Sequence, residues 1–531
     1  MNGNYSPKKH NIKFYLFAGL VGFFIGFYVY PTHQSSVESA QVLANIVRYP
    51  NHNNPMYIYH KKLWSLINQI TAVFLYYGIS EIMLCKITSG IAGALFFLYS
   101  TLLMQLFAAD YLIAFAAPFI LLMLSNFSGL LQGFNYYIHF INTFATFGMI
   151  GFSWCLIAIA LISHKKFKNG LFLCGLAPAI HPSLGVWLNL AAIISLLLFY
   201  NLKFLKKYFH YLFLGYLLTL ISWICHYVFF MPKNDIDKTI KSQYLNAFIK
   251  YWDIHREKKL IITSNFIFLI CGVIIISIIL KKLKKKYDFS FLMFLNIIFF
   301  LIGIIAIIIS KYSPSSYIEN YIQILMPIRI FNFSFILTIF IIFGLIIFCA
   351  NKIMQTNRKQ LLTTLTALKI SVVIFLLIIS IKKFINLKQN NVLEFWTNNK
   401  VLETARKINS GFLLTSAELP LMQLKTRTAL LIDCDQLDLL PYTLEASLII
   451  DDILKNIYNI DLFNPPQSIL KNKQPFIPYY ENKKNWELKN IEEWQNFKKK
   501  YNISSILTHN DYSLNLPIII QDEKYILYGI P

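Results

Sequence analysis

The sequence predicts a mainly α-helical, polytopic membrane protein, with a bundle of about eleven transmembrane helices, one interfacial helix and a small C-terminal α/β domain. Three observations support this fold class: long apolar segments, basic clusters that alternate with them, and a change of composition in the C-terminal part. The whole composition agrees, since 56% of the residues are apolar and 14% are charged. Soluble globular proteins carry roughly a quarter of charged residues, so most of this surface is expected to face lipid.

The length of each apolar segment, at a helix rise of about 1.5 Å per residue, is compared with the thickness of a bilayer core, about 30 Å. Most of them are long enough to cross it, and 170–181 and 110–126 are short. They are 14–30, 87–106, 110–126, 144–163, 170–181, 183–201, 208–230, 260–280, 288–310, 330–350 and 364–381. No small-residue cleavage site follows the first segment, so we expect it to be an uncleaved anchor.

Basic clusters between the segments predict the orientation, because cytoplasmic loops of membrane proteins are rich in Lys and Arg. These clusters are 164–168, 202–207, 281–286 and Lys352/Arg358/Lys359. They place the loops 128–143, 181–183, 231–258 and 311–329 outside, with the N-terminal basic cluster inside. The Lys and Arg residues of these loops account for the formal charge of +23. We therefore do not expect a nucleic-acid partner.

The parity of the spans then assigns one segment to the membrane surface. An even number of crossings is needed between residues 31 and 128, and three candidates lie there: 63–80, 87–106 and 110–126. The first contains Trp64, Asn68 and two tyrosines, which suits an amphipathic helix in the outer interface better than a span. A tight inner turn at residues 108–110 follows from this assignment.

The C-terminal part predicts one soluble α/β domain. We divide the chain into a transmembrane domain, 1–382, and an extracytoplasmic domain, 383–531. Short buried strands are expected at 411–416 and 428–433, and an amphipathic helix at 444–458. A helix followed by a strand is expected within 494–511, and a hairpin within 518–530.

Other motifs set expectations for cofactors. The seven cysteines form no C-x-x-C pair, so neither a zinc site nor a disulfide framework is expected. The chain has no H-E-x-x-H motif and no glycine-rich phosphate loop. We therefore expect no metal, no cofactor and no nucleotide.

The first outer loop carries a recognisable pattern. Glu38 lies near its start, Pro55, Tyr57 and Tyr59 follow, then comes the interfacial segment 63–80, and the next span opens with Gly78, Glu81 and Lys86. Over roughly residues 14–106 this resembles the GT-C superfamily of membrane glycosyltransferases, in particular the protein mannosyltransferase and aminoarabinose transferase group. The first loop has a single acid where many members carry a pair.

The resemblance implies an activity: transfer of a sugar from a polyprenyl-phosphate-linked donor to an acceptor at the outer face of a bacterial inner membrane. Glu38 would be the base that takes the acceptor's proton. Lys86, at headgroup level, would contact the lipid phosphate, although an interfacial lysine also snorkels to headgroups. Arg329 starts another span on the same face and suits bidentate phosphate binding.

Two further places could bind substrate. Asp253, His255 and Arg256 lie close together in an outer loop and could orient an acceptor or a phosphate, or form a solvated helix face. His181 lies at an outer membrane edge, where an ionisable residue is a functional candidate. Pro182 alone also accounts for the helix break there.

A non-enzymatic protein is the alternative, either a transporter or an inactive GT-C-like scaffold of glycan assembly. A transporter is expected to carry polar residues at mid-span in broken helices. The middles of 208–230, 260–280, 288–310 and 330–350 are almost purely apolar. Polar residues gather at the outer edge instead, which favours chemistry on a lipid-linked substrate.

Overall fold

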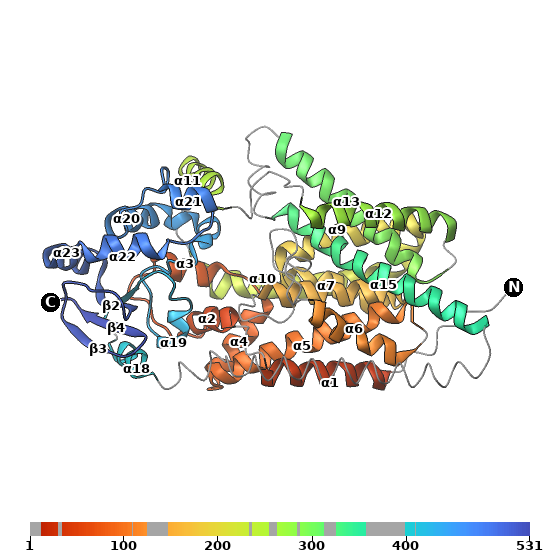
Figure 1. Ribbon diagram of the computed structural model, residues 1–531, viewed down its shortest axis with the longest axis horizontal. Coiled ribbons are helices and arrows are strands. Elements are labelled where there is room, and N and C mark those ends of the chain that lie inside the picture. Colours follow the sequence, from red (N-terminus) through yellow and green to blue (C-terminus); the bar gives the residue numbers. More distant parts are fainter. Residues whose placement is uncertain are drawn as a thin grey trace.

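The structure is a computed structural model, and it is mainly helical (72%), as the sequence predicts. It describes residues 12–29, 34–108, 110–124, 147–232, 236–253, 263–283, 287–312, 325–356, 399–408 and 410–531. Figure 1 shows long helices packed side by side, with the C-terminal domain at one end of the bundle. These apolar helices are α1 (Ile12–Val29), α5 (Glu81–Gln105), α6 (Tyr111–Leu124), α7 (Phe147–Ser163), α8 (Phe167–Ile180), α9 (Pro182–Phe199), α10 (Leu202–Phe229), α12 (Ser264–Leu283), α13 (Phe289–Tyr312) and α15 (Ile330–Thr356).

The outer surface of the bundle is that of a membrane-embedded protein. Among the described residues, six helical segments are long and apolar enough to cross a bilayer: Glu81–Gln105, Pro182–Phe199, Leu202–Phe229, Ser264–Leu283, Phe289–Ile309 and Pro327–Asn351. Phe213 on α10 and Ile274 on α12 are more than half exposed, and a large apolar surface of this kind is stable in lipid rather than water. The count of eleven spans stays a prediction, and the segment 364–381 lies outside the described residues.

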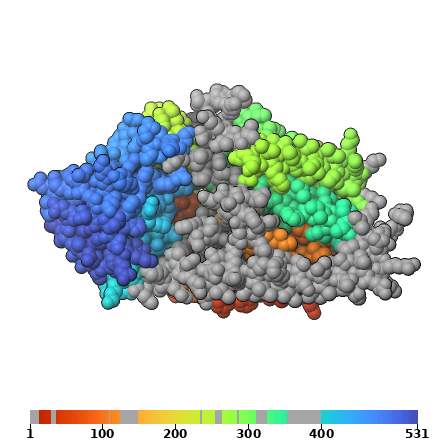
Figure 2. Space-filling model, viewed as in Figure 1, coloured from red at the N-terminus to blue at the C-terminus, as the bar shows by residue number. Residues whose placement is uncertain are grey.

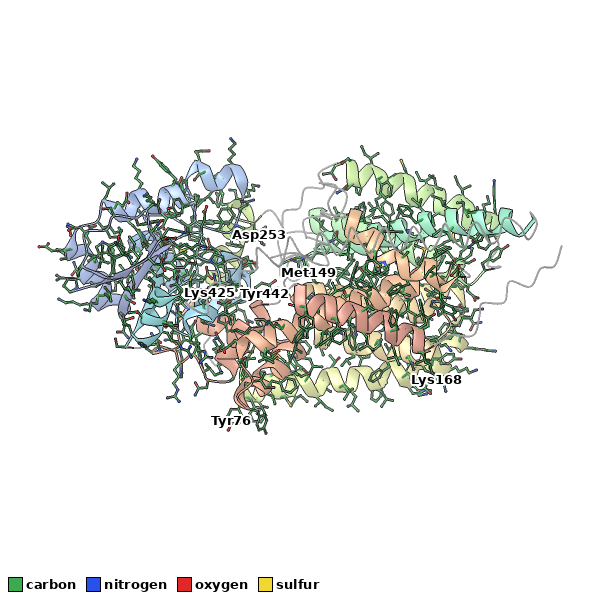
Figure 3. The ribbon with its side chains drawn as sticks, turned by 60° about the horizontal axis from the view of Figure 1, so that its bottom comes forward. Tyr76, Met149, Lys168, Asp253, Lys425 and Tyr442 are labelled. Carbon is green, nitrogen blue, oxygen red and sulfur yellow. The ribbon has the colours of Figure 1, made fainter. Side chains whose placement is uncertain are left out.

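The loops gather at two opposite ends, as the basic clusters predict. At one end His164 Nε2 lies 2.8 Å from the Leu102 carbonyl, and Lys165 pairs with Asp288 at 2.6 Å. At the other end Ser65 donates to the Ile180 carbonyl at 3.0 Å, and Trp187 donates to that of Leu325 at 2.9 Å. Figure 3 shows Lys168 at the end of the bundle that lies away from the C-terminal domain. The cluster at 202–207 is helical, not a loop, because α10 begins at Leu202.

The first loop contains α2 (Gln34–Leu43), α3 (Pro55–Lys62) and α4 (Leu66–Tyr76). Helix α4 has 11 residues and is about 16 Å long, which is too short for a crossing. It is also shorter than the predicted segment, because Ser65 caps its start and Gly78 follows it with a φ of 87°. Val73 and Phe74 are exposed while Asn68 and Leu75 are buried, so α4 has one exposed apolar face, as an amphipathic helix has.

The C-terminal domain contains a four-stranded sheet of order β1-β2-β4-β3. Its strands are β1 (Phe412–Thr415), β2 (Ile503–His509), β3 (Ile518–Gln521) and β4 (Tyr525–Gly529). β1 runs parallel to β2, and β4 is antiparallel to both β2 and β3. Helices surround the sheet: α18 (Lys400–Lys407), α19 (Met422–Thr426), η3 (Leu437–Tyr442), η4 (Leu444–Ala446), α20 (Ser447–Ile457), α21 (Gln467–Asn472), α22 (Tyr479–Glu487) and α23 (Ile491–Tyr501).

Most predicted elements of this domain are confirmed, including β1, the β3–β4 hairpin, α20, and α23 followed by β2. The strand predicted at 428–433 is wrong. Only Leu430 pairs there, through an isolated parallel bridge to Leu413, so the segment lies along the sheet edge without forming a ladder. Its apolar residues Leu430, Leu431 and Ile432 are buried all the same, which explains why the pattern looked like a strand.

The core of the C-terminal domain extends into the membrane domain. Val47, Met56 and Ile58 of the first loop belong to the same buried cluster as the residues of the sheet. Helix α11 (Lys238–Tyr251), a helix that was not predicted in the loop 231–258, adds Phe248 to that cluster. In Figure 2 α11 lies against the C-terminal domain at its edge. The first loop, the segment 236–253 and the C-terminal domain therefore lie on one side of the bundle.

Candidate functional site

Glu38 lies on α2, just after the first apolar helix, and it is buried, with 1% of its surface exposed. Residues of the C-terminal domain cover it. Gln423 of α19 donates from Nε2 to the Glu38 carbonyl at 3.1 Å, and its Oε1 accepts a hydrogen bond from Tyr49. Glu38 therefore lies in an interface between the first loop and the C-terminal domain.

The segment that follows the bridge at Leu430 brings two acids to this interface. Asp433 accepts from the Asp435 backbone N–H at 2.9 Å and from Gln436 Nε2 at 3.0 Å. Asp435 accepts from the Glu418 backbone N–H at 2.9 Å, just beyond the end of β1. Polar residues often collect beyond the carboxyl ends of parallel strands, which explains why they meet here.

Asp433 and Asp435 are absent from the residues that the sequence predicts for the site. They form a D-x-D sequence directly after a buried apolar run, and this signal could have identified them. The prediction that no metal is bound did not consider these two aspartates. Within the described ranges, however, no group of three or more His, Cys, Asp or Glu side chains has the geometry to hold a metal ion.

Burial changes the protonation of this interface. It raises the pKa of Glu38 to about 7, although hydrogen bonds from Gln436 and the Leu424 backbone and the charge of Lys425 oppose the rise. Burial, followed by the charges of Asp435 and Glu38, holds the pKa of Asp433 well above its usual range. Burial also lowers the pKa of Lys425 to about 8, against the charges of the carboxylates around it.

A second polar pair lies beside Glu38. Ser39 Oγ is 3.1 Å from His60 Nδ1, and both side chains are buried. Burial lowers the pKa of His60 to about 3, so its ring is neutral at physiological pH. The imidazole therefore adds no charge to the surroundings of Glu38.

Glu81, the first residue of α5, pairs with the C-terminal domain. Its Oε2 lies 2.5 Å from Arg427 Nη2, and Gln41 of α2 donates to its Oε1 at 3.2 Å. The ion pair joins α5, α2 and the segment after α19 at one point. Lys86, five residues further along α5, is half-buried.

The remaining predicted residues lie in two further places. Arg329 ends the short helix η2 (Pro327–Arg329), where its charge acts on the buried His181. His181 separates α8 from α9, and its Nδ1 accepts from the Leu184 backbone N–H at 3.4 Å. Asp253 is fully buried just after α11. His255 and Arg256 lie outside the described residues.

The structure thus brings Glu38 together with Lys425, Asp433 and Asp435, and it brings His181 near Arg329. The fold and this interface define the class: a polytopic helical membrane protein with an α/β domain docked on its first loop. Comparison with known proteins finds no matching family model, no similar curated protein and no similar solved structure.

Proposed function

We propose that the protein is a membrane glycosyltransferase that moves a sugar from a polyprenyl-phosphate-linked donor to an acceptor. The observation that carries the proposal is the position of Glu38, on a short helix directly after the first apolar helix, with its pKa raised to about 7. A general base is most effective when its pKa lies near the working pH. The GT-C-like pattern of the first loop supports the same role.

In this proposal Glu38 takes the proton of the acceptor hydroxyl as the oxygen attacks the anomeric carbon of the sugar. The bond from that carbon to the phosphate oxygen breaks, and the polyprenyl phosphate leaves with the electron pair. Lys86 and Arg329 stabilise its growing negative charge. His181, Asp253, His255 and Arg256 orient the acceptor or the phosphate.

The proposal also assigns an orientation. The C-terminal domain would lie outside the cytoplasm of a bacterium, at the inner membrane, because the basic cluster at 164–168 lies at the opposite end of the bundle. Both substrates then meet at the face that carries α2 and α4. The open apolar face of α4 supports a location at the lipid surface, where a lipid-linked donor would arrive.

A second function is favoured by one observation. Glu38 is 1% exposed beneath the C-terminal domain, so no acceptor reaches it without a local movement. A non-enzymatic scaffold of glycan assembly, or a transporter, needs no such access. A measurement of sugar transfer distinguishes a glycosyltransferase from a scaffold or a transporter.

The test uses the purified chain in liposomes with radiolabelled lipid-linked sugars. Glu38→Gln keeps the shape of the side chain and removes its basicity, so transfer is expected to fall by about 10²-fold or more while donor binding remains. Lys86→Ala is expected to weaken donor binding instead. Glu492→Gln, an exposed acid on α23, is the matched control and should transfer at the wild-type rate.

Two outcomes would count against the proposal. Full transfer by Glu38→Gln would remove Glu38 from the chemistry. If the wild-type protein neither binds nor turns over any lipid-linked sugar, the non-enzymatic function is the better one.

A further inference from the structure

The contact between α2 and the C-terminal domain contains a group of acids, Glu38, Asp433 and Asp435, which we call the carboxyl cluster. Glu38 and Asp433 are each 1% exposed, and Asp435 is half-buried. One member comes from the first loop and the other two come from the segment after the Leu430 bridge. The cluster therefore lies across the joint between two parts of the chain, within neither of their cores.

The charges around the carboxyl cluster do not balance. Lys425 is the cation that acts on all three acids. The negative charge of Asp438 raises the pKa of Asp433, and that of Glu418 raises the pKa of Asp435. The positive charge of Lys524 lowers the pKa of Lys425. If all three acids of the cluster were ionised together with Asp438 and Glu418, five negative charges would stand against the two positive charges of Lys425 and Lys524 around this joint.

The other titratable groups nearby do not correct this excess. The Tyr49 phenol is buried against Gln423, and burial with the charge of Glu38 raises its pKa, so it stays neutral. His60 is neutral as well, and Arg427 is paired with Glu81. Protonation of the carboxyls removes their negative charge and so lowers the cost of burying the cluster.

Glu38 itself is incompletely satisfied. Its Oε1 is buried and has no hydrogen-bond partner among the described residues. A buried carboxylate oxygen without a partner is costly, whereas a protonated carboxyl has a much smaller desolvation cost. Closing the joint over Glu38 therefore favours its neutral form.

We propose that the carboxyl cluster is a proton-controlled latch, which holds α2 against the C-terminal domain when protonated and releases it when ionised. The apolar contacts of Val47, Met56, Ile58 and α11 with the domain do not titrate and keep the domain attached. The release is a local opening around Glu38 and α19.

The direction of the pH dependence follows from proton linkage. In the closed joint the pKa of Glu38 is about 7, and in the open joint it returns towards its ordinary 4.5. The closed form thus binds more protons between these values, and closure weakens as pH rises through this window. The pKa of Asp433 is also raised in the closed joint, so its ionisation likewise weakens closure as the pH rises. Lys425, with its pKa lowered to about 8, acts in the opposite direction above pH 8, so the test stays below it.

The test is amide hydrogen exchange of the full chain in lipid nanodiscs from pH 5 to 7.5, with exchange times scaled for the intrinsic rate at each pH. Peptides covering α2 and α19 report the opening. For the wild type, their protection is expected to fall by up to about 10²-fold across the range, the limit set by the Glu38 shift. Glu38→Gln should make the pH dependence clearly weaker, and Asp433→Asn should also weaken it if Glu38→Gln fails to fold.

Glu492→Gln, the acid control on α23, should keep the wild-type profile. Protection of α2 that does not change with pH in the wild type overturns the latch, and so does a Glu38→Gln profile that still follows the wild type. The exchange measurement needs no sugar transfer. A failed transfer assay therefore leaves the latch standing, and a failed exchange test leaves the glycosyltransferase proposal standing.

Discussion

At the scale of single residues, the most informative contact outside the carboxyl cluster is the ion pair between Glu81 and Arg427. The Glu81 side chain is 6% exposed and that of Arg427 is 35% exposed. Glu81 also lies in the first turn of α5, where the helix dipole favours a negative charge. Arg427 itself adopts a positive φ of 52°, so the turn after α19 is held in an uncommon conformation that presents the guanidinium to Glu81.

Replacing Arg427 with Ala is expected to destabilise the protein by about 1–3 kcal/mol, because it leaves a buried carboxylate with Gln41 as its remaining side-chain partner. The measurement is the apparent melting temperature in detergent. Lys500→Ala is the control, since it breaks an exposed pair with Asp452 and should cost less than about 1 kcal/mol. Equal effects of the two substitutions would contradict the assigned role of Arg427.

At the scale of elements, α1 and α5 pack with their backbones in close contact. A Cβ added at Gly22 would lie 2.3 Å from the Gly93 carbonyl oxygen, and one added at Gly93 would lie 2.2 Å from that of Gly22. Gly22 and Gly26 form a G-x-x-x-G sequence, which is common where membrane helices approach closely. This packing places the start of α2, and with it Glu38, next to the start of α5.

Gly22→Ala is therefore expected to push α1 away from α5 and to cost about 1–3 kcal/mol, the usual range for overpacking. Gly19→Ala on the same helix is the matched control. Its Cβ would meet only the Leu98 side chain, at 3.3 Å, and alanine gains about 1 kcal/mol of helix propensity. Melting temperatures of the two variants in detergent test this. A loss for Gly19→Ala as large as that for Gly22→Ala would show that the close backbone approach is not the cause.

At the scale of the whole molecule, the first loop, α11 and the C-terminal domain share one side of the bundle. Lys62 and Lys241 both pair with Glu445, at 2.7 Å and 3.3 Å. Trp252 donates to the Leu462 carbonyl at 2.9 Å. Figure 3 shows Asp253, Lys425 and Tyr442 near this junction, far from Lys168.

Cysteines introduced at Asn51, Tyr77 and Glu492 are thus expected to react with an impermeant thiol reagent in intact cells. A cysteine at Lys168 should react only after permeabilisation. The physical reason is that α4 does not cross the membrane, so the positions before and after it stay on the side of the C-terminal domain.

This labelling needs a background in which the exposed Cys225, Cys271 and Cys349 are replaced by Ser. If Asn51 and Tyr77 label from different sides, α4 crosses and the parity of the spans is wrong. If all four positions show the reverse pattern, the relative arrangement holds and the C-terminal domain lies inside.

Sequence patterns alone predicted the apolar helices, a helix within 63–80 and most elements of the C-terminal domain. These features are local: an apolar run folds as a helix in lipid wherever it lies in the chain, and Ser65 and Gly78 mark the ends of α4 from adjacent positions. Alternating basic clusters likewise predicted which loops share an end of the bundle. The strand predicted at 428–433 failed because burial alone does not specify a pairing partner.

Tertiary structure decided the surroundings of Glu38. The sequence placed this residue just after the first span, but the side chain that contacts its backbone belongs to Gln423, which is 385 positions away. Asp433 and Asp435 reach the same place because a segment beside β1 ends there. Such a meeting depends on how two separately formed surfaces fit together, and no pattern within either segment encodes it. The burial that raises the pKa of Glu38 therefore arises only in the folded molecule.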